Sequence, residues 1–276
     1  LINIPSTYIR LTDYKSSEEK EKEFFNPVNR YKAKQEDFEK ISGTPIGYWV
    51  SDKVRNIFFN NKNLTDVSIP RQGMATSDND RFLKQWTEVE HRNIGFGYEN
   101  REDALVSTLK WFPYNKGGEN RKWFGNDELI VNWENDGQEI KDYRDFKNST
   151  LSSNMGVAGL NDIFKPSISW SLTSSSDFAV RFKEKGFLFD VNGMSIFPDE
   201  NDFNYYISFL NTVVCSRFLA ILNPTISFQA GNIKLLPIVF LKSDSIKQQI
   251  ETLTQQNINI SKEEWDSRET SWDFTK

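Results

Sequence analysis

The sequence predicts an α+β fold, with a mixed, largely antiparallel sheet, flanking helices, and a C-terminal helix and tail. Apolar residues alternate with a period of two through the middle of the chain, whereas a 3.6-residue period takes over from Asn204 to Leu222. The pair Asn192-Gly193, set between two apolar runs, predicts a hairpin with a type I′ turn and hence an antiparallel part of the sheet. The 276 residues, 37% of them hydrophobic and 26% charged, have an ordinary globular composition.

The first 41 residues are predicted to form a connector that precedes a compact domain. A short apolar alternation opens the segment, and the charged run Ser-Ser-Glu-Glu-Lys-Glu-Lys-Glu at 16–23 predicts a solvated helix. Ser42-Gly43-Thr44-Pro45 then interrupts the chain. Apolar residues at helical spacing follow, with Ser51 as the expected N-cap.

Strands are predicted for the central region, which we assign to one domain over residues 42–240. Period-two runs with polar residues on the other face cover 129–133, 168–172 and 178–182, and the predicted hairpin joins 187–191 to 194–197. The helix over 204–222 ends at Asn223-Pro224. A short apolar piece, 226–240, follows it.

The last 36 residues, 241–276, are predicted to be a helix and a tail. Ser243 or Asp244 caps a helix that runs to about Leu253. From Ser261 onward aromatic and acidic residues show no periodicity, so the tail docks on another domain or partner, or lies loose.

Composition excludes several classes of site. The chain has one histidine, His91, and one cysteine, Cys215, which removes most zinc sites and most catalytic triads. Cys215 sits among apolar residues and is expected to be a buried thiol, and His91 a solvated imidazole. Without a run of about 18 apolar residues we expect no membrane span and a cytoplasmic location. No catalytic, cofactor or metal-ligating residue is predicted.

Two weaker motifs have simpler explanations. Asn93-Ile94-Gly95-Phe96-Gly97 lacks the flanking strand and helix of a nucleotide-binding glycine turn, which favours a surface turn. Asp127 with Glu139-Ile140-Lys141 has the spacing of a Mg²⁺-dependent nuclease, a pattern that also arises by chance among 39 acids. We keep the nuclease as the less favoured alternative.

The stretch from Trp111 to Gly125 alternates five aromatic rings with cations and amides. One interpretation is a strand, turn and strand with inward rings and solvated cations. The other is a nucleic-acid surface, because such rings, amides and cations suit phosphates and base edges. The two combine if the rings at both ends anchor the sheet and the turn from Tyr114 to Lys122 faces DNA. The net charge of −5 argues against nonspecific polyanion binding, but only the contacting face of a sequence reader has to be basic.

A tight polar loop runs from Pro70 to Leu83 into an apolar strand. Here the sequence resembles the target-recognition domains of Type I and Type IIG restriction-modification proteins. It is more closely similar to the adenine-specific DNA methyltransferases of BREX phage-defence systems. Further blocks carry the resemblance in order along nearly the whole chain: 45–51, 111–125, 131–137, 186–190, 209–212, 222–225 and 265–274.

The resemblance implies a DNA target-recognition region of an adenine-N6 methyltransferase. In the parent enzyme, S-adenosylmethionine and an Asn-Pro-Pro-Tyr/Phe motif serve the flipped adenine. This sequence has no Pro-Pro pair, so we expect a piece that follows the methyltransferase domain, with residues 1–41 as its connector and no cofactor of its own. Double-stranded DNA and that methyltransferase domain are the implied partners. An alternative is a protein-interaction module that docks other defence-complex subunits through the aromatic-acidic tail.

Candidate DNA contacts follow from side-chain chemistry, because cations suit phosphates or guanine and amides suit adenine edges. The candidate cations are Arg71, Arg81, Lys116, Arg121 and Lys122. The candidate amides are Gln72, Asn79, Asn115 and Asn120, and the hydroxyls are Thr76 and, in the loop Thr173–Ser176, Ser174.

Overall fold

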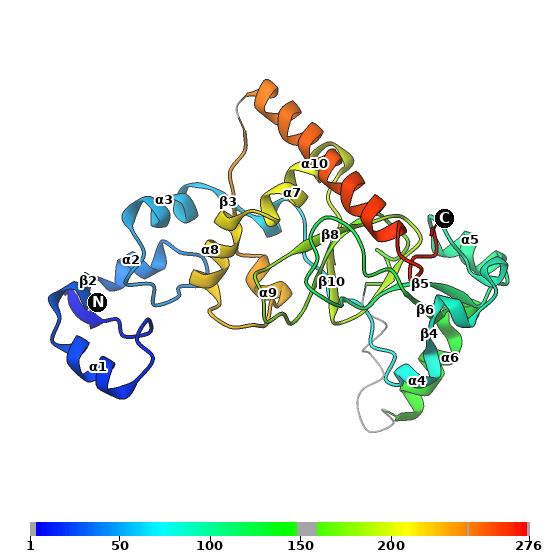
Figure 1. Ribbon diagram of the computed structural model, residues 1–276, viewed down its shortest axis with the longest axis horizontal. Coiled ribbons are helices and arrows are strands. Elements are labelled where there is room, and N and C mark those ends of the chain that lie inside the picture. Colours follow the sequence, from blue (N-terminus) through cyan, green and yellow to red (C-terminus); the bar gives the residue numbers. More distant parts are fainter. Residues whose placement is uncertain (1–3, 148–158, 242, 275–276) are drawn as a thin grey trace.

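The computed structural model describes residues 4–147, 159–241 and 243–274. The molecule is elongated: the N-terminal elements lie at one end of the long axis, and the C-terminus lies toward the other end (Figure 1). Helices and small, mainly antiparallel sheets are mixed along the chain, so the predicted α+β class is confirmed.

The N-terminal end is a small unit of its own secondary structure. Strands β1 (Ser6–Ile9) and β2 (Arg30–Ala33) pair antiparallel around helix α1 (Ser17–Phe24) and a 3₁₀ turn, Pro27–Asn29. Helices α2 (Gln35–Glu39) and α3 (Asp52–Asn60) follow. Both caps obey the sequence rules: Ser16 closes a capping box with Glu19, and Ser51 accepts a hydrogen bond from Val54 N–H at 3.4 Å.

The middle of the molecule is a three-stranded antiparallel sheet, in the order β10 (Gly193–Ile196), β7 (Ser167–Ser171), β8 (Val180–Lys183). Its apolar face, which includes Ile168, Trp170 and Val180, packs in one core with helices α7 (Glu200–Leu210), α8 (Val213–Leu222) and α9 (Ala230–Ile233). Strands β3 (Lys62–Asn63) and β11 (Pro237–Ile238) pair beside the 3₁₀ turn Leu64–Asp66.

A second sheet, in the order β4 (Leu83–Gln85), β6 (Leu129–Asn132), β5 (Trp111–Asn115), β9 (Leu188–Phe189), lies next to the first. Its β5–β9 pair is parallel and the others are antiparallel. Helices α4 (Asn79–Phe82), α5 (Arg101–Val106) and α6 (Glu134–Lys147) and the 3₁₀ turns Trp86–Glu88 and His91–Asn93 surround it. Its own core is centred on Phe112, Tyr114 and Val131.

The predicted hairpin at Asn192-Gly193 is wrong. Neither residue has the positive φ of a type I′ turn, and the flanking strands enter different sheets, β9 beside β5 and β10 beside β7. The turn is closed instead by Gly193 N–H on the Asp190 carbonyl at 3.1 Å. This segment therefore links the two sheets, and Gly193 is needed for space, because a Cβ there would lie 2.3 Å from the Asn115 carbonyl oxygen.

The single helix predicted over 204–222 is two helices, α7 and α8, bent by 74°. Thr212 caps α8 by accepting from Cys215 N–H at 3.1 Å, and Asn211 turns its amide onto strand β8. In the described part of the chain no single helix is long and apolar enough to cross a membrane, although this bent pair passes on length and composition alone.

The C-terminal helix is longer than predicted. Ser243 caps it as expected, but α10 (Asp244–Asp266) continues well past Leu253. Thr254, Ile258 and Trp265 lie buried along it, too sparsely spaced to reveal the period in the sequence. In Figure 1 the helix runs obliquely over the sheets and delivers the C-terminus to the β5 end of the molecule.

Candidate nucleic-acid interface

Three of the predicted polar segments, far apart in sequence, meet on one surface. Lys116 Nζ donates to Asn79 Oδ1 at 2.9 Å, which joins the 71–81 loop to the end of β5. Asn120, in the loop that follows β5, donates from Nδ2 to Ser174 Oγ at 3.3 Å and to the Asp177 carbonyl. These contacts join the loop 116–122 to the segment after β7. We call the exposed parts of 71–81, 116–122 and 173–177 the three-loop surface.

The loop 71–81 is fixed by backbone contacts at its base. Arg71 exchanges both backbone hydrogen bonds with Ser195 of β10, at 2.8 and 3.1 Å. Gly73 packs so closely on strand β9 that a Cβ would lie 2.0 Å from the Phe189 carbonyl oxygen, so only glycine fits. Arg71 and Gln72 are exposed, and the Arg71 side chain forms a 3.4 Å ion pair with Asp162.

A buried carboxylate positions Lys116. Asp190 accepts from the Tyr114 hydroxyl at 2.7 Å and from Lys116 Nζ at 3.2 Å, and its other oxygen accepts from Asn192 N–H at 2.8 Å. Burial, and then the Asp190 charge, raises the pKa of Tyr114 well above its usual value, so the phenol stays a donor. The chain thereby points a half-buried ammonium at the Asn79 side chain.

Two of the residues predicted to contact DNA are buried in this structure. Asn115, only 1% exposed, gives its amide to Ser169 Oγ at 2.6 Å and to the Gly193 carbonyl at 2.9 Å, so it ties the two sheets together. Thr76, only 2% exposed, donates to Asn79 Oδ1 at 2.8 Å. Both side chains are engaged by hydrogen bonds within the chain. Tyr114, expected at the start of an exposed turn, is likewise fully buried.

The other predicted cations have partners within the chain. Arg81 binds Glu139 at 2.7 Å, and this contact lowers the pKa of Glu139. Arg121 pairs with Glu264 of α10 and lies over the Trp265 ring at 5.0 Å. The exposed Lys122 donates from Nζ to the Asn211 carbonyl at 2.9 Å.

Strand β8 carries two buried cations that sequence reasoning missed. Arg181 and Lys183 lie on the polar face of the β10-β7-β8 sheet and are 1% and 0% exposed. Burial, with a further contribution from Arg121, lowers the pKa of Arg181 to about 10 and that of Lys183 to about 7. In the sequence, Arg181 and Lys183 alternate with Val180 and Phe182. This alternation normally indicates that the charged residues face water, so it did not predict that they are buried.

The residues of the nuclease pattern do not assemble. Asp127 is buried in an ion pair with Lys183, Glu139 binds Arg81, and Lys141 binds Asp136 at 2.7 Å. Among the described residues, no group of three or more His, Cys, Asp or Glu side chains has an arrangement suited to a metal ion. As expected, Cys215 is buried, and burial raises the pKa of its thiol far above the usual range.

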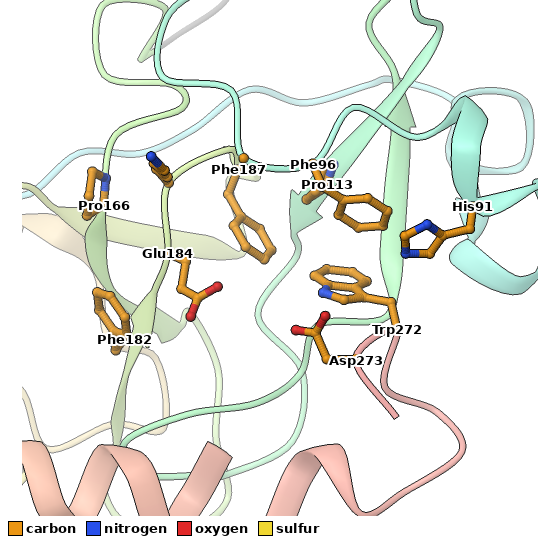
Figure 2. A pocket seen from close by; sticks show the side chains of 11 residues that line it. His91, Phe96, Pro113, Pro166, Phe182, Glu184, Phe187, Trp272 and Asp273 are labelled. Carbon is orange, nitrogen blue, oxygen red and sulfur yellow. The ribbon is translucent and has the colours of Figure 1, made fainter. Parts of the chain in front are cut away.

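The C-terminal tail docks onto the same chain. Trp272 packs against Phe96 and Phe187 at ring-centroid distances of 5.2 and 5.7 Å, and Trp86 Nε1 donates to the Thr270 carbonyl at 2.8 Å. The rings of Trp272, Phe96 and Phe187 border a pocket of about 520 Å³, with His91 at its edge (Figure 2). The aromatic residues that suggested partner docking are thus already in contact with other parts of this chain.

The chain is similar to two adenine-specific methyltransferases over nearly its whole length. It is 37% identical over 279 residues to the adenine-specific methyltransferase PglX of Lacticaseibacillus casei (strain Zhang), a match that covers 98% of this chain and 22% of that protein. It is 34% identical over 278 residues to the adenine-specific methyltransferase BrxX of Escherichia coli O9:H4 (strain HS), covering 98% of this chain and 21% of that protein.

No protein-family model matches the chain. The solved structure of the type IIG restriction endonuclease BpuSI aligns with 82% of this chain and 30% of its own, with a TM-score of 0.40 and 13% identity. The chain spans about a fifth of the length of the two methyltransferases. Over that fifth the resemblance stated from the sequence is confirmed, and the chain is a homologue of the adenine-specific methyltransferases PglX and BrxX.

Proposed function

We propose that the chain is the DNA target-recognition region of an adenine-specific DNA methyltransferase. The observation that carries the proposal is the three-loop surface, where polar segments that contain Asn79, Lys116 and Ser174 come together although they are remote in sequence. A rigid scaffold that presents several loops on one side is the usual arrangement for a binding surface.

The exposed side chains divide by chemistry. Arg71 and Lys122 suit phosphate oxygens, since each carries a cation on an exposed residue. Gln72 is an exposed amide and suits a bidentate contact with an adenine edge in the major groove. Asn120 is also exposed, and because its Nδ2 is held by Ser174 and Asp177, it offers its Oδ1 as an acceptor. Asn79 joins them at the centre of the surface, where it accepts hydrogen bonds from Thr76 and Lys116.

Adenine flipping and methyl transfer are assigned to the remainder of the parent protein. The glycine turn at 95–97 does not fit S-adenosylmethionine, because Gly95 packs against the Phe112 ring and donates its N–H to the Trp111 carbonyl at 2.8 Å. Helix α5 begins only at Arg101, so no helix N-terminus follows the turn. We expect cofactor binding outside this chain.

Fluorescence-anisotropy titration against labelled duplexes tests the proposal. Gln72→Ala is expected to weaken binding to a preferred duplex by about 1–3 kcal/mol and to leave binding to a scrambled duplex unchanged. Lys122→Ala is expected to weaken both duplexes alike and to reduce the salt slope by about 0.9.

Lys20→Ala is the matched control, because Lys20 is an exposed lysine on α1 at the far end of the molecule (Figure 1). It should leave both affinities and the salt slope unchanged. If Gln72→Ala, Lys122→Ala and Lys20→Ala all reduce binding equally on both duplexes, the three-loop surface does not read sequence.

A further inference from the structure

The loop from Gly117 to Lys122 is held from one side through its carbonyl groups. Asn126 donates from Nδ2 to the Gly117 carbonyl at 3.2 Å and to the Glu119 carbonyl at 2.9 Å. Asn126 itself has a φ of 62°, and Gly117 and Gly118 have φ values of 85° and 108°. The tight path of the loop therefore depends on left-handed positions that side chains disfavour.

Strands β7 and β8 hold the remaining carbonyls. Ser171 Oγ donates to the Gly118 carbonyl at 2.8 Å. Arg181 donates from Nη1 to the Glu119 and Arg121 carbonyls at 3.3 and 3.4 Å, and from Nη2 to Ser171 Oγ at 3.1 Å. Four successive or nearly successive carbonyls thus point toward the body of the protein.

In a trans peptide the N–H points opposite to the preceding carbonyl. The described residues contain no cis peptide bond, so the N–H groups of Gly118, Glu119, Asn120 and Lys122 point away from the sheet. These four residues are exposed, and no hydrogen bond joins their N–H groups to any group in the described ranges. The loop offers a row of outward donors.

Behind this row lies a cation without a counter-ion. Arg181 forms no ion pair with a described residue, and its Nε has no hydrogen-bond partner although the side chain is buried. The positive charge of Arg121 adds repulsion rather than compensation. A buried charge without a counter-ion is costly, and an anion seated on the outer side of the loop would reduce that cost.

We propose that the N–H groups of Gly118, Glu119, Asn120 and Lys122 donate to phosphate oxygens of duplex DNA, with buried Arg181 as a positioning residue behind them. The inference rests on the proposed function and deepens it by assigning a phosphate contact to backbone amides. Glu119 carries the one carboxylate of the loop 117–122, and its charge opposes the contact.

Amide chemical shifts of the whole chain, with ¹⁵N-labelled glycine, test the contact directly. Saturating duplex DNA should shift the Gly118 N–H resonance and leave that of Gly231, in α9, unmoved. Inorganic phosphate at the same concentration should produce no saturable shift. Saturation by inorganic phosphate alone would overturn the assignment to the DNA backbone.

Asn126→Gly removes the side chain that holds two of the carbonyls and suits the positive φ at this position. We expect about a tenfold loss of affinity for every duplex sequence. Since amide donors are uncharged, the salt slope should stay the same, unlike in Lys122→Ala. Asn135→Gly is the matched control, because Asn135 also has a positive φ, of 50°, but is exposed and lies in the turn that opens α6.

Glu119→Gln should strengthen binding at low salt, and the gain should fade as salt rises. Arg181→Met removes the charge and should lower both the affinity for DNA and the salt slope. Arg181→Lys keeps the charge and should keep the salt slope. If both Arg181 variants unfold, Asn126→Gly and the Gly118 resonance still decide.

Unchanged affinity in Asn126→Gly, or an unmoved Gly118 resonance on DNA-bound protein, would overturn this inference and leave the proposed function standing. Absence of any DNA binding by the unmodified chain would overturn both.

Discussion

Among the single residues, buried charged groups hold the loops of the molecule in place. Asp190 anchors Lys116, and Asp127 binds Lys183, which also donates to the Gly125 carbonyl at 2.8 Å. Burying such a pair costs free energy because both charges lose their hydration, and removing one partner costs more because the other charge stays buried and unpaired. Their value here is geometric, because each holds the segment 115–127 in a defined path over the sheet.

Removing the Tyr114 hydroxyl tests the Asp190 network. Tyr114→Phe should lower the free energy of unfolding by about 1.5–3 kcal/mol, because a buried carboxylate loses a hydrogen-bond donor. Tyr98→Phe, in the same core but without a hydroxyl hydrogen bond among the described residues, should change it by less than about 0.5 kcal/mol. Urea titration measures both, and equal effects would contradict the network.

A double-mutant cycle tests the Asp127–Lys183 pair. Asp127→Asn and Lys183→Met are each expected to cost about 3–5 kcal/mol, since each leaves a buried polar partner unpaired. The double variant should cost less than the sum of the two by about 1–3 kcal/mol. Strict additivity in urea unfolding would show that the two groups do not interact.

Among the elements, the break between α7 and α8 is tied to strand β8 by the side chain of Asn211. Asn211 accepts from Val180 N–H and donates to the Val180 carbonyl, both at 3.0 Å, and so occupies the place of a neighbouring strand on β8. Its own carbonyl accepts from Lys122. The bend therefore seals the edge of the sheet and connects the helices to the candidate DNA loop.

Asn211→Leu extends the apolar helical pattern but leaves the Val180 N–H without its acceptor, whereas the Val180 carbonyl keeps the hydrogen bond from Trp123 N–H at 2.9 Å. We expect the free energy of unfolding to fall by about 1–3 kcal/mol. Asn257→Leu, at an exposed site of α10, should stay within about 0.5 kcal/mol. A stable Asn211→Leu variant with unchanged DNA affinity would refute this role.

Local signals predicted the elements better than they predicted the partners of those elements. The caps at Ser51 and Ser243 and the alternation of β6, β7 and β8 follow from short-range rules. The Asn192-Gly193 hairpin failed because long-range pairing with β5 and β7 outweighs turn preference. Arg181 and Lys183 were missed because charged residues alternating with apolar ones normally face water.

At the scale of the whole molecule, the C-terminal tail closes the far end of the structure. Lys262 of α10 binds Glu184 at 3.0 Å and Asp273 at 3.6 Å, and Trp272 covers the pocket between Phe96 and Phe187. No sequence pattern predicted this docking of the tail. Apart from the Lys262–Asp273 ion pair, the contacts join residues that are 78 or more positions apart.

Trp272→Ala should lower the free energy of unfolding by about 2 kcal/mol, less than the ~3–5 kcal/mol typical of a fully buried ring, because Trp272 is half-buried. Limited proteolysis should then cut after α10. Phe146→Ala, an exposed aromatic on α6, is the control and should have little effect. Unchanged stability and protease resistance would mean that the tail is not docked as described.

Selection of bound duplexes from a random DNA library by the whole chain tests whether the three-loop surface reads bases, because the selection itself reveals the recognised site. We predict that one sequence motif is enriched and that Gln72→Ala together with Asn120→Ala relaxes it at particular positions. Enrichment of no motif by a chain that binds duplex DNA, or a motif unchanged in the double variant, would contradict base reading by the three-loop surface.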